Sequence, residues 1–171
     1  MSLEEALAGK EIPSDVRSTL VIIDVPFLSF KDEESVGQLV LHRDVAKSAQ
    51  ALFATLFNMR FQIEKMVPIV RYEWDDDASM EDNNTSAFNY RLIYGTDRLS
   101  NHSFGRAIDI NPMQNPYQRR DGTTVPLGSQ YDLIQKGTVT PQIAELFKSK
   151  GWSWGGDWNE IKDWQHLEKL D

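Results

Sequence analysis

Two short segments hold two of the three histidines of the chain, each with a carboxylate and glycines close by. In the first segment, Ser100 to Pro112, His102 precedes Asp109 by seven positions. The second segment, Trp152 to Glu168, contains His166. Catalytic zinc sites without thiolates use His nitrogen and carboxylate oxygen, with three protein ligands and a fourth position left open. His102, Asp109 and His166 supply such a set of ligands.

Asp163 lies three positions before His166. Hydrolysis at such a metal requires a carboxylate that accepts a proton from the attacking water and returns it to the leaving amine. The position of Asp163 beside a proposed ligand suits this role. A histidine next to an aspartate is, however, more often a simple hydrogen-bonded pair. The spacing alone therefore leaves both interpretations open, a metal site and two structural pairs.

The composition excludes several other kinds of chemistry. The chain has 171 residues and no Cys, which rules out disulfides, thiolate zinc sites, iron–sulfur clusters and cysteine nucleophiles. Asp and Glu number 26 against 18 Lys and Arg, a formal charge of −8, so nucleic acid is not an expected partner. The length and the ordinary globular composition predict one domain over residues 1–171, with a polar lead-in at 1–17.

No membrane span is expected, because the longest apolar run, Leu20 to Phe30, is interrupted by Asp24 and Pro26. The first residues are acidic and do not resemble a signal peptide. Nothing in the sequence fixes an oligomeric state.

The elements that must position these residues are strands and helices in mixed order, which predicts an α+β domain. The clearest helix is 44–58, in which Val45, Ala49, Leu52, Phe53 and Leu56 share one apolar face. A second helix begins at Thr140, an N-cap residue followed by Pro141. Residues 18–30 predict a strand followed by a turn marked by Pro26, and 36–41 predict a second strand. The remaining expectations are an extended segment at 66–72, an acidic loop at 75–86, a long surface segment at 111–139, and the end of the second helix near residue 150.

Both histidine segments also resemble the motifs of one enzyme family. S-N-H-S-F-G-R-A-I-D is similar to the S-x-H-x-x-G-x-A-x-D motif of the D-alanyl-D-alanine carboxypeptidase family of zinc peptidases, peptidase family M15. W-G-G-D-W-N-E-I-K-D-W-Q-H-L-E is similar to the C-terminal block of that family. The resemblance extends from Leu39 to Glu168, and the upstream stretch D-D-A-S-M-E-D-N-N-T-S-A-F-N-Y-R looks like a block from an uncharacterised branch of the family.

The resemblance implies a role for each matching residue. His102, Asp109 and His166 correspond to zinc ligands, and Asp163 corresponds to the general base. Family members also carry an upstream arginine, commonly in an S-G-Y-R-S context, that stabilises the oxyanion of the tetrahedral intermediate. The nearest match here is F-N-Y-R, which gives Arg91 without the preceding S-G. Three further residues fit supporting or structural roles: Ser100 as an orienting partner of His102, Arg106 in a surface salt bridge, and His42 as a structural histidine.

The implied function is zinc-dependent hydrolysis of peptide bonds in the stem peptides of bacterial peptidoglycan, by zinc-activated water. The implied activity is of the D-alanyl-D-alanine carboxypeptidase or L-alanyl-D-glutamate endopeptidase type. The expected partner is a peptidoglycan stem peptide or a short peptide that contains D-amino acids. The implied fold is the D-alanyl-D-alanine peptidase or hedgehog-like fold, with a small central antiparallel sheet and flanking helices. The implied location is the cell envelope, periplasmic or secreted.

Two alternatives stay open at this point. One is a non-catalytic module that binds zinc or cell-wall peptides, against which Asp163 argues, because a binding module needs no proton acceptor. The other is a zinc amidase that cuts the junction between sugar and peptide. The negative charge favours a housekeeping enzyme over a free lysin, because wall teichoic acids are polyanions and would not attract the chain.

Overall fold

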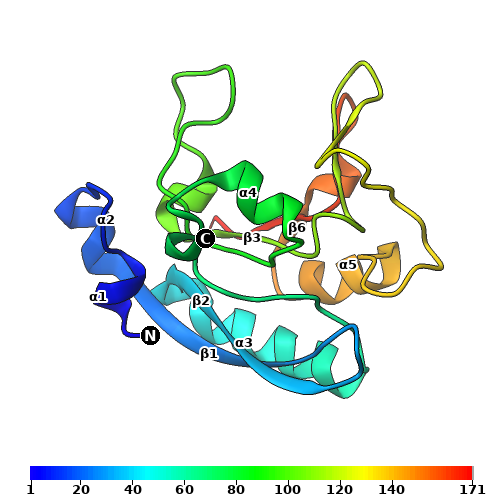
Figure 1. Ribbon diagram of the computed structural model, residues 1–171, viewed down its shortest axis with the longest axis horizontal. Coiled ribbons are helices and arrows are strands. Elements are labelled where there is room, and N and C mark those ends of the chain that lie inside the picture. The colour runs from blue at the N-terminus through cyan, green and yellow to red at the C-terminus, as the bar shows by residue number, and fades with distance from the viewer. Residues whose placement is uncertain (171) are drawn as a thin grey trace.

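The structure is a computed structural model, which describes residues 1–170 (Figure 1). Helices and strands follow one another in mixed order along the chain, and the strands within each of the three sheets pair antiparallel. The elements are α1 (Leu3–Ala6), α2 (Ser14–Thr19), β1 (Leu20–Leu28), β2 (Glu34–His42), α3 (Arg43–Asn58), η1 (Ile69–Tyr72), α4 (Asp76–Glu81), η2 (Asn101–Phe104), β3 (Ala107–Asp109), β4 (Tyr117–Gln118), β5 (Thr124–Val125), α5 (Pro141–Lys148), β6 (Ser153–Trp154), η3 (Gly155–Asp157), β7 (Lys162–Asp163) and β8 (His166–Glu168).

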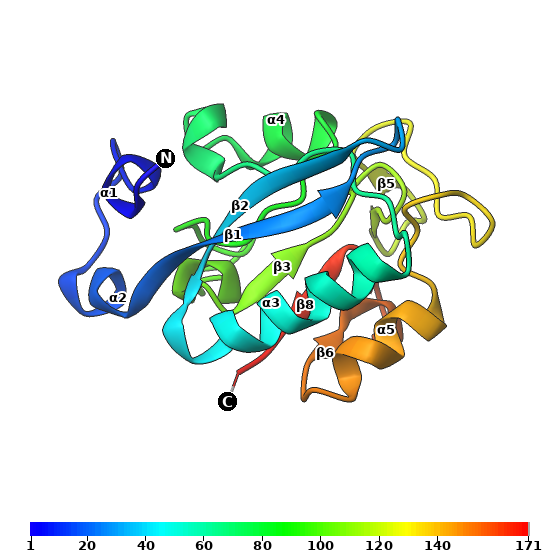
Figure 2. The same ribbon diagram turned by 90° about the horizontal axis from the view of Figure 1, so that it is seen from below.

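A long hairpin and one helix form the base of the fold. Strands β1 and β2 pair antiparallel from Leu20 opposite His42 to Leu28 opposite Glu34. Helix α3 follows directly, and Figure 2 shows it running alongside the hairpin. The first turn of α3 is capped by the His42 ring, whose Nδ1 accepts a hydrogen bond from the main-chain N–H of Asp44 at 3.2 Å. The expectation that His42 is structural is consistent with this contact. The strands predicted within 18–30 and at 36–41 and the helix predicted at 44–58 are present. The turn predicted at Pro26 is absent, because β1 is an edge strand that tolerates proline and continues through Pro26 to Leu28.

The hydrophobic core extends from this base to the two histidine segments. The buried face of α3 packs with residues of β1, α5 and the sheet that carries the motifs. In the centre, the Phe147 ring meets Phe53 and Trp152 edge-on, with centroid distances of 6.4 and 6.1 Å. Edge-to-face packing of large rings fixes their relative orientation as well as burying apolar area. The motif strands therefore rest on a rigid base.

Two three-stranded sheets bring the chemical residues together. One has the order β3-β8-β6, with Asp109 directly opposite His166, and the other has the order β5-β4-β7, with Tyr117 opposite Asp163. The α+β class is as predicted, but the single small central sheet is replaced by three separate sheets. The reason is strand length: the motif strands have only two or three residues each, because turns and 3-10 segments interrupt them.

Two segments differ from the prediction. Residues 66–72, expected to be extended, include the 3-10 helix η1, and the acidic loop expected at 75–86 contains helix α4. Asp75 caps α4, because its Oδ1 accepts a hydrogen bond from Ala78 N at 3.0 Å. Asp76 and Asp77 lie in its first turn, where negative charge is stabilised by the helix dipole. Within residues 1–170, no helix has both the length and the apolar character needed to cross a membrane.

Candidate metal centre and active site

The two histidine segments meet in a buried group of three side chains, His102, Asp109 and His166. His102 Nε2 lies 3.1 Å from Asp109 Oδ2, and His166 Nδ1 lies 3.1 Å from Asp109 Oδ1. The two imidazole nitrogens are 3.2 Å apart. A tetrahedral ion with ligands at 2.0–2.1 Å would hold its ligand atoms about 3.3–3.4 Å from one another. The three atoms therefore have the spacing that a small divalent metal requires.

Local backbone geometry sets this arrangement. His102 lies in the 3-10 helix η2, which ends at Gly105 with φ +65°. The carbonyl of Gly105 accepts a hydrogen bond from His42 N at 2.9 Å, and a Cβ on Gly105 would come within 2.6 Å of the same nitrogen. Only glycine allows this approach, which docks η2 against the end of β2. Asp109 and His166 face each other because they are direct partners in the β3–β8 ladder.

Each imidazole is oriented through the nitrogen that points away from the group. His102 Nδ1 contacts the main-chain oxygen of Ala87. His166 Nε2 lies 3.2 Å from Glu168 Oε2, which also accepts a hydrogen bond from the Asn101 amide. Such outer partners fix the tautomer and ring orientation of metal-binding histidines. Ser100, expected to orient His102, instead caps η2 by accepting a hydrogen bond from His102 N at 3.3 Å.

Glu168 is a supporting residue that the sequence reasoning did not single out. A signal was present, because residues two apart in a strand point to the same face of the sheet. The sequence H-L-E therefore places Glu168 beside His166. Asn101 has no comparable signal, because its contact with Glu168 joins residues 67 positions apart.

The charges of the three side chains act on one another at short range. Burial alone would lower the pKa of His166, but hydrogen bonds to Asp109 and Glu168 outweigh it and raise that pKa to about 10. Burial alone would raise the pKa of Asp109, but the two imidazoles outweigh it and hold that pKa far below its usual range. The metal-free group therefore keeps a proton on His166 at neutral pH. A metal ion must displace that proton.

Asp163 has different surroundings. It is half-buried, and its Oδ1 is shielded from solvent without a hydrogen-bond partner. Burial raises the pKa of Asp163 to about 7, with His166 opposing the shift and Asp109 adding to it. A carboxylate that titrates near neutral pH and keeps a free oxygen is suited to exchange protons with a reacting molecule.

Arg91 is held close to the group by two contacts. Its main-chain N–H donates to Ser103 Oγ at 2.9 Å, next to His102 in the chain, and its guanidinium pairs with Asp76 at 2.8 Å. The Nε of Arg91 is buried without a partner. Arg106, by contrast, donates to Asp44 at 3.1 Å and to the main-chain oxygen of Leu170 at 3.0 Å. Arg106 thus has the salt-bridge role expected of it.

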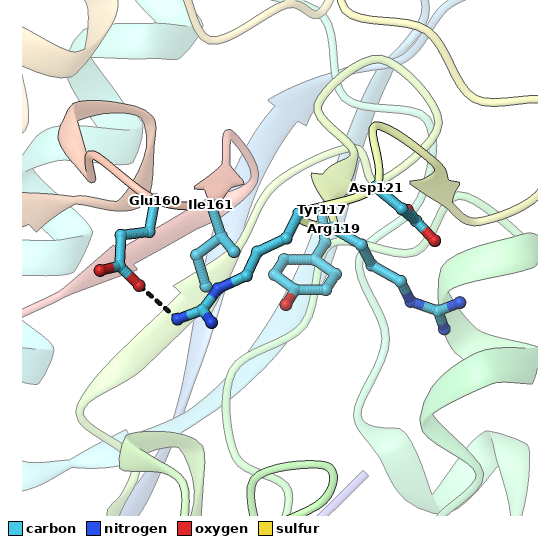
Figure 3. Close-up of a pocket in the computed structure, with 6 residues that line it drawn as sticks. Tyr117, Arg119, Asp121, Glu160 and Ile161 are labelled. Atoms are coloured by element: carbon cyan, nitrogen blue, oxygen red, sulfur yellow. Dashed lines mark hydrogen bonds and ion pairs between the residues drawn. The ribbon is translucent and has the colours of Figure 1, made fainter.

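A hollow of about 460 Å³ lies beside β7, shown in Figure 3. Its lining residues are Tyr117, Arg119, Arg120, Asp121, Glu160 and Ile161. Directly paired residues of an antiparallel ladder project from the same face of the sheet. Tyr117 is paired with Asp163, so the hollow continues the face on which Asp163 lies. Arg120 is paired with Glu160 across it.

The chain is similar to known peptidases over the part that contains this group. The family profile described as D-alanyl-D-alanine carboxypeptidase matches residues 94–169, which include His102, Asp109, Asp163 and His166 but not Arg91. The chain is 29% identical over 131 residues to the peptidoglycan L-alanyl-D-glutamate endopeptidase CwlK of Bacillus subtilis (strain 168). That alignment covers 76% of this chain and 74% of the relative.

The comparison with solved structures gave no significant match. The similarity to the M15 family of peptidases therefore rests on the profile, the relative and the His–Asp–His group that the structure assembles from both motifs. Together they show that the chain resembles M15 peptidases over the part that contains this group.

Proposed function

We propose that this protein is a zinc-dependent peptidase that hydrolyses peptide bonds in the stem peptides of bacterial peptidoglycan. The observation that carries the proposal is the position of Asp163, a carboxylate with a free, shielded oxygen and a pKa near 7, beside three side chains with metal-ligand spacing. A site that only binds metal or peptide has no use for such a proton acceptor. The family and the named activity of the Bacillus relative support the substrate class.

His102 Nε2, Asp109 and His166 Nδ1 would hold the metal. Nitrogen and carboxylate donors without sulfur fit zinc, and three protein ligands leave a position open for the reaction. When bound, zinc polarises the substrate carbonyl and lowers the pKa of a water molecule toward neutrality. The outer contacts to Ala87 and Glu168 keep both imidazoles turned toward that ion.

Asp163 would act as the general base and then as the general acid. In its ionised form it takes a proton from the attacking water, and it later gives the proton to the departing amine. Burial suits both steps, because a pKa near 7 makes the carboxylate a good acceptor and its protonated form a good donor.

Arg91 would stabilise the negative charge that develops on the carbonyl oxygen. A fixed cation at that oxygen lowers the energy of the transition state more than that of the substrate. The contact with Asp76 holds the guanidinium in place, and the buried Nε has no partner in the protein. Arg91 is therefore the cation that we assign to this role.

The bond between L-alanine and D-glutamate is our preferred cleavage site, because the Bacillus relative is named for that activity. The location we propose is the cell envelope, where this substrate is found. For the fold we propose kinship with the D-alanyl-D-alanine peptidase and hedgehog-like zinc peptidases.

The test is digestion of purified muropeptides by the zinc-loaded protein, with the products identified by mass. Cleavage between L-alanine and D-glutamate leaves alanine on the sugar and releases a peptide that begins with glutamate. Loss of only the terminal D-alanine would assign carboxypeptidase activity instead. Binding of muropeptides without any product, with zinc present, would overturn the proposal in favour of a binding module.

A further inference from the structure

Four buried side-chain polar atoms in residues 1–170 have no hydrogen-bond partner, and all four lie in the segments around the His–Asp–His group. They are Asn89 Oδ1, Arg91 Nε, Asp163 Oδ1 and Gln165 Oε1. Buried polar atoms in native proteins are nearly always paired, so a concentration of unpaired atoms at one place calls for an explanation. The proposed function uses Arg91 and Asp163. It leaves two amide oxygens without a role.

The orientation of the Asn89 amide is fixed by its neighbours. The side chain is 2% exposed, and its Nδ2 donates to Asp76 Oδ1 at 3.0 Å. An ionised carboxylate only accepts hydrogen bonds, so the atom facing Asp76 must be the nitrogen. The oxygen is therefore the unpaired atom. The main-chain N–H of Asn89 donates to the carbonyl of His102 at 3.2 Å, which places the residue next to the metal-binding group.

The Gln165 amide is fixed in a similar way. Gln165 is also 2% exposed and lies between Asp163 and His166 in the chain. Its Nε2 donates to Met80 Sδ at 3.6 Å. The thioether sulfur is an acceptor, so the nitrogen faces it and the oxygen remains without a donor.

One short helix supports both amides. Asp76 and Met80 are four residues apart in α4 and therefore lie on the same face of that helix. Asp76 holds Asn89, and Met80 contacts Gln165. The two free oxygens are thus held in place by a single element on the side of the metal-binding group.

We infer that Asn89 and Gln165 are substrate-binding residues, each accepting a hydrogen bond from a different N–H group of the bound peptide. This inference rests on the proposed function and extends it. An unpaired carbonyl oxygen needs a donor, and an extended peptide offers its main-chain N–H groups at regular intervals. The recognised groups would be amides next to the bond that is cut.

The test uses stem-peptide analogues in which one N–H next to the scissile amide is replaced by an ester oxygen, one position at a time. Loss of a hydrogen bond that leaves a buried group unpaired costs about 1–3 kcal/mol. For the wild type we therefore expect kcat/KM to fall by about 5- to 150-fold on the analogue that lacks the recognised N–H. Gln165→Met keeps the length of the side chain but removes the acceptor. The kcat/KM of Gln165→Met on the normal peptide should be lower than that of the wild type by a similar factor. Its kcat/KM should not fall further when the normal peptide is replaced by that analogue.

Asn89→Ala should lose its discrimination between amide and ester at a different N–H, the one that Asn89 recognises. This second variant tests the inference if Gln165→Met does not fold. Gln114→Met is the matched control, because the Gln114 oxygen already accepts from Asn83 at 2.8 Å. It should distinguish the ester from the amide as the wild type does.

The inference is wrong if kcat/KM of Gln165→Met and of Asn89→Ala falls by the same factor as that of the wild type on every analogue, relative to the normal peptide. In that case the two amide oxygens do not contact the substrate. Failure of the wild type to cleave any of these peptides would be a separate result. It would reject the proposed function itself, and the inference with it.

Discussion

The guanidinium of Arg91 forms an ion pair with Asp76, with 2.8 Å between Nη2 and Oδ2. The pair connects the segment that leads to His102 with helix α4. Both residues precede residue 94, where the match to the family profile begins. Both side chains are only partly exposed, at 29% and 26%, so the pair is more constrained than a typical surface salt bridge. The position of Arg91 therefore depends on Asp76.

We predict that Arg91→Ala lowers kcat by about 10²–10³, the usual effect of removing one group that stabilises an oxyanion. Asp76→Asn should lower kcat less, because the guanidinium remains but loses the partner that holds it. Steady-state kinetics on a muropeptide, with zinc content measured in parallel, checks both changes. Arg98→Ala, in an exposed loop, is the control. A fully active Arg91→Ala enzyme would show that another group stabilises the oxyanion.

The sequence predicts the residues of the candidate metal-binding group, His102, Asp109 and His166, better than the residues that support it. His102 and Asp109 belong to one short motif, and His166 stands out because the chain has only three histidines. The contacts of Asp76 with Asn89 and Arg91 connect residues 13 and 15 positions apart through a helix that an acidic run conceals. The capping position of Asp75 was a signal for that helix, but three consecutive aspartates are also typical of a loop.

The division of the predicted central sheet also has a physical reason. The glycine pair Gly155–Gly156 opens a 3-10 turn that ends β6 after two residues, and β7 also has only two residues. The segment 111–139 is more than a surface loop, since Asn111 and Asn115 are fully buried. Both amides donate to the main-chain oxygen of Gly137, near the far end of that segment. Such contacts depend on the tertiary structure and leave no periodic pattern in the sequence.

The protein should bind about one zinc ion per chain through His102, Asp109 and His166. Elemental analysis of protein purified without chelator checks the stoichiometry. His102→Ala and His166→Ala should lose the metal, because two protein ligands rarely hold zinc. His42→Ala is the matched control, since His42 caps α3 and lies outside the group. Zinc content that is unchanged in the first two variants would contradict the ligand assignment.

Glu168→Gln should weaken zinc binding by about 10- to 100-fold without abolishing it. The carboxylate of Glu168 faces His166 Nε2 at 3.2 Å and helps to hold the ring with Nδ1 toward the group. The glutamine amide is similar in size to the Glu168 carboxylate but neutral, so it makes His166 Nδ1 a poorer ligand. Competition with a chromophoric chelator measures the change. A variant with wild-type affinity would mean that packing alone orients His166.

The stability of the metal-free protein should fall as pH rises from about 4 to about 10. Asp163, with its pKa raised to about 7, and His166, with its pKa raised to about 10, both bind protons more tightly in the folded state. Raising the pH above their unfolded values of 3.8 and 6.5 therefore favours unfolding. The pKa of Asp109 is lowered in the folded state, so its contribution to stability is lost as pH falls below about 4 and the carboxylate is protonated.

Zinc should reverse the effect of His166, because the ion binds the deprotonated ring. Melting temperatures at pH 5, 7 and 9, with chelator and with zinc, check this prediction. The gap between the two curves should widen as pH rises. A constant gap would mean that no proton is displaced when the metal binds.

Asp163→Asn separates an enzyme from a binding module. The change keeps the size of the side chain but removes the proton acceptor, so hydrolysis should fall by about 10²–10⁴-fold. The ionisation of Asp163 should set the acidic limb of the pH profile of the wild-type activity. This limb should lie at or below the Asp163 pKa of about 7, because a bound cation favours the carboxylate. The limb should be absent from the profile of Asp163→Asn.

Zinc content should stay near one per chain in Asp163→Asn, and above pH 7 the variant should melt at or above the wild-type temperature. The reason is that a half-buried carboxylate must ionise there at a cost that the neutral amide does not carry. Loss of zinc would instead identify Asp163 as a ligand. Unchanged hydrolysis with zinc retained would show that a group other than Asp163 transfers the proton.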